Sequence, residues 1–276
     1  MKKLIIVADW GDDALATQEV RSAIEGFLKS SPAKTTPNIN IIPSSPSTIH
    51  TSFLIGQTVE IEERYGEPLD TIIFQNTDPM SEHTEESGGV GSQLLILRLK
   101  SGIYVIGPNA GYVFSFVRPK IEEAFYYPRL EMSGQFRSRD VFAKVAAYFM
   151  DVLQDDLDLD EIHPNQIPQL DGYFVGHMDN FGNIKTTVPE SVLKGKYSLG
   201  DELSITINGV TQKMKYVKSL FDGGPNSLII YPGSSGKIDD PYLEISVCTD
   251  FSAKNPKTGK DLFNSPRPGM KIEIQI

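Results

Sequence analysis

The most constraining feature of this sequence is a change in the spacing of its apolar residues near residue 170. Before that point, short runs of apolar residues alternate with segments of helical spacing. The apolar runs are KLIIVAD (3–9), INIIP (39–43) and TIIFQN (71–76), and the helical patterns cover about 14–29 and 50–65. Short apolar runs separated by helices are typical of a sheet that is covered on both faces. We therefore predict an N-terminal α/β domain with a mostly parallel sheet over residues 1–165.

Two more apolar segments, LLILRL (94–99) and IYVIG (103–107), are separated by a short gap that ends in glycine. This arrangement predicts a β-hairpin. The segment FRSRDVFAKVAAYFMD (136–151) then has helical spacing. Ser138 suits the N-cap of this helix and Asp140 suits the positive end of its dipole, whereas the exposed N–H groups of a helix start also suit an anion. Both interpretations stay open at this point.

After residue 170 the strands become short, mostly alternating and separated by Gly, Asn, Asp and Pro. They are YFVGHM, ELSITI, QKMKYV, SLIIYP, YLEISV and KIEIQI. This pattern predicts a C-terminal antiparallel β-barrel domain over residues 170–276. The acidic segment before it, 151–172, lacks the glycine and final glutamate of a calcium loop, so we interpret it as a linker.

The composition excludes several classes of function. The net charge of −10 argues against a nucleic-acid partner or an anionic membrane surface. One cysteine, Cys248, cannot form an intrachain disulfide framework. No run of about 18 apolar residues occurs, and the apolar run at the N-terminus is too short for a signal peptide. We expect a cytoplasmic protein that acts on a small molecule.

Carboxylates follow two of the predicted strands. Asp9 ends the first strand and Asp78 follows the third. Ligands of open α/β sheets gather at the carboxyl ends of strands, so these side chains are candidate ligand contacts. The loop 80–92 is rich in polar residues and glycine and contains His83, but it lacks the ending of a phosphate-binding loop. We predict a loop that covers a site.

The second half contains two polar turns with candidate binding residues. MDNFGN (178–183) offers a carboxylate at Asp179, a ring at Phe181 and an amide at Asn183. YPGSSGK (231–237) offers two hydroxyls, Ser234 and Ser235. The four histidines and one cysteine give neither a zinc spacing nor a Ser-His-Asp order, so no metal site is expected.

These pieces occur together, and in the same order, in one known family. They are Asp9-x-Gly11, Asp78-Pro79, Gly107-Pro108-Asn109-x-Gly111, Arg139-Asp140-x-Phe142-Ala143, Asp179-x-Phe181-Gly182-Asn183 and Ser234-Ser235-Gly236. Over nearly its full length the chain resembles the S-adenosylmethionine hydroxide adenosyltransferases, which include the fluorinases and chlorinases. The resemblance implies a homotrimer that binds S-adenosylmethionine at its subunit interfaces and displaces methionine from the ribose C5′.

The resemblance also implies a role for each matched residue. Asp9 is expected to bind the ribose hydroxyls, and Asp78 to lie on the side of the nucleophile. Asp179 and Ser234, with Ser235 beside it, are expected to hold the methionine end. Phe181 and Asn183 are expected to line the ligand pocket.

The chain departs from the family around the nucleophile. Members that use water carry an Asp–Arg–His set, of which only Asp78 is present here. Arg137 stands at the expected histidine, and Gln93 or Leu94 at the expected arginine. Ser138 matches the serine of halide-using members, but the long extra loop of the fluorinases has no counterpart. We expect residues 137–140 to face the nucleophile.

Three functions remain open. The first, which we favour because water-using members are commoner, is hydrolysis of S-adenosylmethionine to adenosine and methionine, with Asp78 orienting water and Arg137 or His83 assisting. The second is a chlorinase-like reaction in which Arg137 and Ser138 hold the halide. The third is a protein that binds S-adenosylmethionine or adenosine without turnover. In each case S-adenosylmethionine is the substrate or ligand, and no cofactor is expected.

Overall fold

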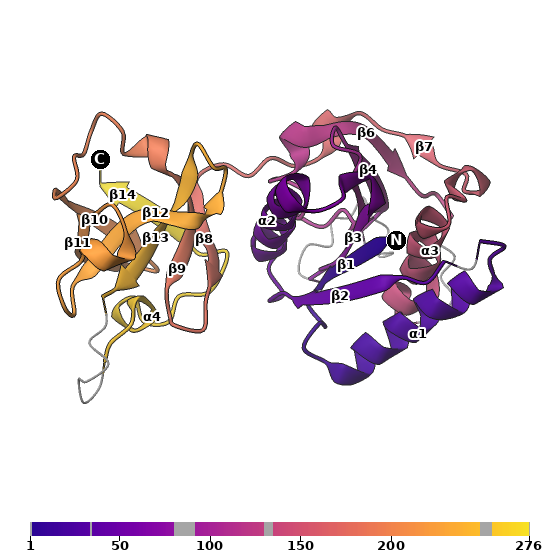
Figure 1. Ribbon diagram of the computed structural model, residues 1–276, viewed down its shortest axis with the longest axis horizontal. Helices are drawn as coiled ribbons and strands as arrows, with labels where there is room; N and C mark the ends of the chain where they lie inside the picture. Colours follow the sequence, from indigo (N-terminus) through magenta and orange to yellow (C-terminus); the bar gives the residue numbers. More distant parts are fainter. Residues whose placement is uncertain (1, 34, 80–91, 130–134, 249–255, 276) are drawn as a thin grey trace. The chain divides into compact units, whose positions relative to one another are not determined.

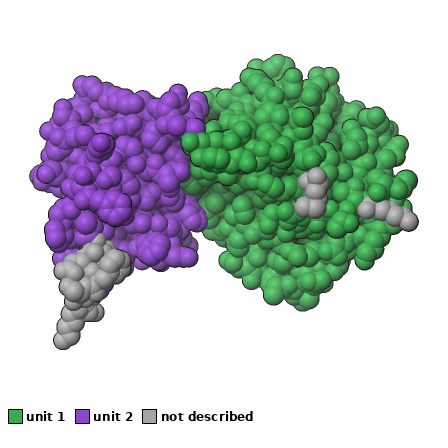
Figure 2. All heavy atoms as spheres, viewed as in Figure 1, with its two compact units in different colours: residues 1–170 green, residues 171–276 purple. Residues whose placement is uncertain are grey.

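The computed structural model describes residues 2–33, 35–79, 92–129, 135–248 and 256–275. The chain divides into two compact units, which we call unit 1 (Met1–Leu170) and unit 2 (Asp171–Ile276), coloured separately in Figure 2. Each unit has its own buried core.

Unit 1 is built on a seven-stranded sheet with the order β2-β1-β3-β5-β4-β6-β7. Its strands are β1 (Lys3–Ala8), β2 (Asn38–Pro43), β3 (Thr71–Asn76), β4 (Leu94–Leu99), β5 (Tyr104–Pro108), β6 (Ile121–Tyr126) and β7 (Asp160–Glu161). The neighbours from β2 to β5 pair in parallel, whereas β5, β4, β6 and β7 pair antiparallel. The hairpin of β4 and β5 is confirmed, but the prediction of a mostly parallel sheet is wrong. The strand β6 was not predicted because two exposed glutamates, Glu122 and Glu123, interrupt its apolar run.

Helices cover both faces of this sheet. They are α1 (Ala14–Ser30), α2 (Thr48–Tyr65) and α3 (Ala143–Met150), with short helical turns at Pro68–Asp70, Arg118–Lys120, Gln154–Asp156 and Pro164–Gln166. Leu4 and Ile6 of β1 pack in one core with α1 and α3, and Ile5 and Val7 pack in the other with α2. Alternate side chains of a strand point to opposite faces, so α1 and α3 lie on one side of the sheet and α2 on the other, as Figure 1 shows.

The helix α3 begins differently from the prediction. A π-helical turn, Ser138–Phe142, precedes it, and Arg137 already has helical backbone angles (φ −57°, ψ −34°). The amides of Arg139 and Asp140 both donate to the carbonyl oxygen of Phe136. Ser138 therefore lies inside the helical segment and is buried, so the prediction that it is the N-cap is wrong.

Within its described residues, unit 2 contains seven strands and one short helix. They are β8 (Tyr173–Met178), β9 (Ile184–Pro189), β10 (Glu202–Ile207), β11 (Val210–Tyr216), β12 (Leu228–Gly236), β13 (Pro241–Val247), β14 (Lys271–Gln275) and α4 (Gly259–Leu262), with turns at Glu190–Val192 and Leu220–Asp222. The pairing order β10-β11-β12-β13-β9-β8-β14 closes on itself, because β14 also pairs with β10. All pairs are antiparallel except a short parallel contact between β11 and β12. The apolar face of every strand points into one core around Ile205, Ile230 and Ile245.

Candidate functional site

Two carboxylates meet at the carboxyl ends of β1 and β3. Ala8 and Asn76 are in register, and the amide of Asp9 donates to the carbonyl oxygen of Asn76 over 3.1 Å. From β1 the chain crosses to β2 on one side, and from β2 it crosses back to β3 on the other side. Ligands of open α/β sheets bind at such a reversal of strand order, so the fold places Asp9 and Asp78 where a site is expected.

Asp78 is held by two residues from other parts of unit 1. Arg137 donates from Nη2 to its Oδ2 over 2.6 Å, and Ser92 donates from Oγ to its Oδ1 over 3.0 Å. The Ser92 amide lies 3.3 Å from Oδ2, and its carbonyl oxygen accepts from Arg137 Nη1 over 3.5 Å. The side chains of Arg137 and Asp78 are 24% and 20% exposed. We refer to Asp9, Asp78, Ser92 and Arg137 as the strand-end cluster.

The cluster alters the acidity of Asp9. Burial raises the pKa of Asp9 above its ordinary value, and the negative charge of Asp78 raises it further. Backbone N–H groups that donate to the carboxylate oppose this rise without cancelling it. Asp9 is therefore an acceptor whose ionised form is poorly solvated in the free protein.

The rest of the 137–140 stretch makes other contacts. Arg139 donates to both carboxylate oxygens of Asp140, over 2.7 and 3.0 Å, and it also reaches Glu19 of α1. The hydrogen bonds from Arg139 lower the pKa of Asp140. These two residues border a surface hollow beside α1. Of the four residues expected at the nucleophile, Arg137 is thus the one that contacts Asp78, and Ser138 follows it as a buried residue.

Three buried hydroxyl groups form hydrogen bonds next to the end of β3. Thr77, which precedes Asp78, lies 2.7 Å from Thr51 and 3.1 Å from Ser44, measured between hydroxyl oxygens. Ser44 and Thr51 also bond to each other over 3.1 Å. These three hydroxyls could not be predicted, because isolated Ser and Thr residues give no pattern before the fold brings their three segments together.

In unit 2, the turn between β8 and β9 is organised around Asp179. Its Oδ1 accepts from the amides of Phe181 and Asn183, and its Oδ2 accepts from the side-chain amide of Asn183, each over 2.9 Å. The ring of Phe181 remains 73% exposed. Gly182 has a left-handed backbone (φ +77°), and a Cβ there would come within 2.5 Å of the Thr258 hydroxyl. The turn is therefore fixed in shape while it presents an aromatic ring to solvent.

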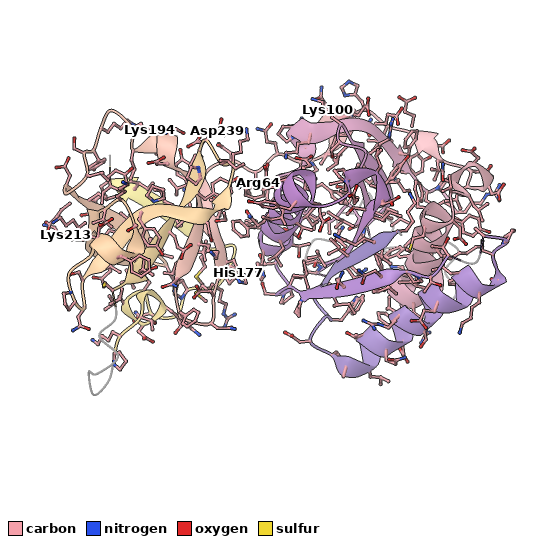
Figure 3. All side chains as sticks on the ribbon, viewed as in Figure 1. Arg64, Lys100, His177, Lys194, Lys213 and Asp239 are labelled. Atoms are coloured by element: carbon pink, nitrogen blue, oxygen red, sulfur yellow. The ribbon has the colours of Figure 1, made fainter. Side chains whose placement is uncertain are left out.

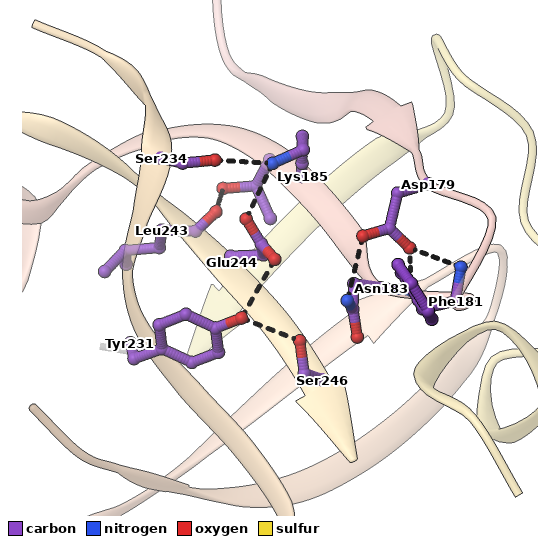
Figure 4. A network of polar contacts seen from close by, with 10 residues as sticks. Asp179, Phe181, Asn183, Lys185, Tyr231, Ser234, Leu243, Glu244 and Ser246 are labelled. Atoms are coloured by element: carbon purple, nitrogen blue, oxygen red, sulfur yellow. Dashed lines mark hydrogen bonds and ion pairs between the residues drawn. The ribbon is translucent and has the colours of Figure 1, made fainter. Parts of the chain in front are cut away.

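A second polar group on β9, β12 and β13 involves Ser234 (Figure 4). Lys185 donates to Ser234 Oγ over 2.7 Å and to Glu244 Oε2 over 3.0 Å. Tyr231 donates to Glu244 Oε1 over 2.9 Å and contacts Ser246 over 3.0 Å. Burial is the main reason that the pKa of Tyr231 is raised, so this hydroxyl stays protonated. Ser235, the other predicted binding residue, is buried.

Lys185, Glu244 and Tyr231 are not among the residues predicted from the sequence. Their strands read as ordinary alternating strands, and Lys185 is separated from its partners Ser234 and Glu244 by 49 and 59 positions along the chain. The one available signal was a charged residue at positions 185 and 244 on strands otherwise rich in apolar and hydroxyl side chains.

Some predicted features lie outside the described residues. His83 and most of the predicted covering loop belong to 80–91. Within the described ranges, no group of three or more His, Cys, Asp or Glu side chains could hold a metal ion. Nor does any described helix have the length and apolar character needed to cross a membrane.

Comparisons with known proteins agree with this architecture. Residues 174–253 match the family model of the SAM hydroxide adenosyltransferase C-terminal domain. An uncharacterized conserved protein from Thermotoga maritima is 19% identical, with a TM-score of 0.70 over 98% of this chain and 99% of that one. A conserved hypothetical protein from Thermus thermophilus is 15% identical, with a TM-score of 0.61 over 99% of this chain and 100% of that one.

At these identities the two structures establish a shared fold and no more. No curated protein matches the chain. The family match agrees with the resemblance drawn from the motifs: residues 174–253 are similar to the C-terminal domain of the SAM hydroxide adenosyltransferases.

Proposed function

We propose that this protein hydrolyses S-adenosylmethionine to adenosine and methionine, with water as the nucleophile at the ribose C5′. The observation that carries the proposal is the contact of Arg137 with Asp78 at the carboxyl end of β3. It leaves a carboxylate at the expected nucleophile position, oriented by a guanidinium and by Ser92. A carboxylate is a hydrogen-bond acceptor, and a water molecule is the nucleophile that can donate to it.

The charge of the strand-end cluster favours water over a halide. Asp9 and Asp78 carry two negative charges when ionised, and Arg137 carries one positive charge, so these described residues sum to −1. Arg137 also donates to Asp78 over 2.6 Å, and this ion pair neutralises the cation that a chloride ion would need. The chlorinase-like alternative therefore has less support than hydrolysis.

The reaction needs positioning more than acid–base strength. The water oxygen forms a bond to C5′ while the C5′–S bond breaks, and the electron pair goes to sulfur. The sulfonium thereby becomes the neutral thioether of methionine, so no acid has to protonate the leaving group. Asp78 accepts a hydrogen bond from the attacking water, whose proton passes to solvent after the displacement. Holding water, C5′ and sulfur in line is the main catalytic contribution.

The remaining predicted residues take their roles from the family resemblance. Asp9 accepts from the ribose hydroxyls, and the exposed ring of Phe181 stacks on the ligand. Asn183 lines the pocket, while Asp179 and Ser234 hold the methionine end. The homotrimer implied by the resemblance is part of the same proposal, and light scattering during size-exclusion chromatography measures it.

The test is incubation of the purified protein with S-adenosylmethionine in chloride-free and chloride-containing buffers, followed by chromatography of the nucleosides. We expect adenosine at equal rates in both buffers, and its loss in the Asp78→Asn variant. A 5′-chloro-nucleoside that requires chloride would establish the halide alternative instead. Recovery of intact ligand from a stable complex would establish a binding protein without turnover.

A further inference from the structure

Lys185 is held in place by a chain of buried groups. Lys185 and Glu244 are paired in register on β9 and β13, and the side chains are 20% and 8% exposed. Glu244 is fixed from its other oxygen by Tyr231, which in turn contacts Ser246. The ammonium group of Lys185 therefore occupies a defined position at the more exposed end of a buried network.

The contact between Lys185 and Ser234 leaves hydrogen-bond donors unused. An ammonium group has three N–H donors, and Glu244 and Ser234 accept two of them. The oxygen of Ser234 accepts from Lys185, so the hydroxyl hydrogen of Ser234 can donate elsewhere, and no described residue accepts it. Two donors 2.7 Å apart at their heavy atoms, one of them charged, suit the two oxygens of a carboxylate.

Asp179 supplies a negative charge in the same part of unit 2. It follows β8 directly, and its carboxylate acts electrostatically on both His177 and Tyr231. Lys185 acts on His177 with the opposite sign, and the two residues are in register. Asp179 thus follows β8 and Lys185 lies on the neighbouring strand β9, and Figure 4 draws both side chains in one view.

We propose that Lys185 and Ser234 together bind the carboxylate of an α-amino-acid head group whose ammonium group is held by Asp179. Lys185 is then a specificity residue that selects ligands carrying a carboxylate. The inference rests on the proposed function, because that proposal brings the methionine end of S-adenosylmethionine to Ser234. It goes further by assigning Lys185, and through Lys185 the positioning residues Glu244 and Tyr231.

The experiment compares S-adenosylmethionine with its decarboxylated form, which keeps the sulfonium, the ammonium group and adenosine. Binding of both is measured by calorimetry in the Asp78→Asn background, which suppresses turnover. We expect the parent to prefer S-adenosylmethionine by at least about 10-fold, the range of one charged hydrogen bond. Lys185→Met should abolish this preference by weakening S-adenosylmethionine binding about 10- to 100-fold, with less than about a 2-fold effect on the decarboxylated ligand.

Two matched variants make the result specific. Lys185→Arg keeps the positive charge and should retain most of the preference. Lys213→Met removes an exposed lysine from β11, labelled in Figure 3, and should change neither affinity. If Lys185→Met fails to fold, the double variant Lys185→Met/Glu244→Gln removes both charges of the pair and is measured in its place.

The outcomes separate this inference from the function on which it rests. A protein that binds neither ligand and forms no adenosine overturns both proposals. If S-adenosylmethionine is bound or hydrolysed but Lys185→Met keeps the preference, the inference alone is overturned. An equal loss of affinity for both ligands would likewise overturn it, because Lys185 would then only maintain the fold.

Discussion

The contact between Arg137 and Asp78 makes a prediction that does not depend on any ligand. We consider the variants Arg137→Gln, Asp78→Asn and the double variant, compared as a double-mutant cycle. The cycle isolates the energy of the pair from the other contacts of each residue. Two residues that stabilise each other in the folded protein give a favourable coupling free energy, whereas two residues that act independently give none.

The structure sets the expected size of this coupling. A hydrogen bond to a charged group contributes about 1.5–3 kcal/mol, whereas an exposed ion pair contributes about 0.2–1 kcal/mol. The coupling free energy of Arg137 and Asp78 should lie between these two values, because about a fifth to a quarter of each side chain is exposed. Because Ser92 continues to donate to Asp78 in the variants, we expect a coupling of about 1.5 kcal/mol at low ionic strength.

The two single variants should differ in cost. Arg137→Gln leaves Asp78 without its counter-charge while Asp9 stays nearby, so we expect unit 1 to lose about 2 kcal/mol of its free energy of unfolding. Asp78→Asn removes a charge that raises the pKa of Asp9, so relief of repulsion partly compensates the lost ion pair. Its expected cost is about 1 kcal/mol.

The only tryptophan of the chain provides the assay. Trp10 donates to Asn76 Oδ1 over 3.0 Å and packs edge-on against Phe136, the residue before Arg137. Urea unfolding followed by tryptophan fluorescence therefore reports on unit 1 next to the pair, and an unchanged m-value supports comparison of the variants.

The control is an exposed pair in the same unit, Arg98 and Glu123, studied with Arg98→Gln, Glu123→Gln and their double variant. Its coupling should be much smaller than that of Arg137 and Asp78, because solvent screens both charges. A coupling for Arg137 and Asp78 that is no larger than this control would refute the reasoning, as would a greater cost for Asp78→Asn than for Arg137→Gln.

Three further predictions concern single residues. Because the pKa of Asp9 is raised in the folded protein, its contribution to stability is present at low pH and is lost as the pH rises through that pKa. Asp9→Asn should therefore raise the melting temperature at pH 7 but not at pH 3, and it should abolish adenosine binding. A gain in melting temperature that persists at pH 3 would contradict this. Gly182→Ala should destabilise unit 2 by about 1–3 kcal/mol more than Gly195→Ala, which has a similar φ but open space around it, and chemical unfolding of the two variants measures the difference. Phe181→Ala should leave the melting temperature unchanged but weaken adenosine binding about 5- to 100-fold, whereas the control Phe221→Ala, also at an exposed ring, should affect neither.

Much of unit 1 could be predicted because its central strands are apolar on both faces. The apolar runs of β1 and β3 predict strands inside a covered sheet, because their residues have to be buried on both faces. The antiparallel half could not be predicted in the same way. In β6 only part of the strand is buried, and β7 is a two-residue exposed edge with no apolar pattern at all.

Some residues of the candidate site could likewise be predicted from the sequence, and others could not. Asp9, Asp78 and Asp179 could be selected because each comes at or just after the end of a strand. Lys185, Glu244 and Ser92 could not, since their roles depend on contacts across strands and loops that local sequence does not encode. Ser138 was misinterpreted for a related reason, because the helical backbone starts before it and a π turn replaces the expected cap.

The chain differs from the family pattern at two positions on the nucleophile side, and the contacts of Arg137 compensate for one of these differences. Compared position by position, the chain lacks both an arginine near Gln93 and a histidine at position 137. In the structure, however, the guanidinium of Arg137 contacts Asp78 from the start of the helical segment that leads into α3. Arg137, at the position of the expected histidine, thus supplies the positive charge that the expected arginine near Gln93 would have supplied. One cation therefore still balances the charge of Asp78. Only the histidine is then without a replacement among the described residues, and the proposed displacement of a sulfonium leaving group would need no acid in its place.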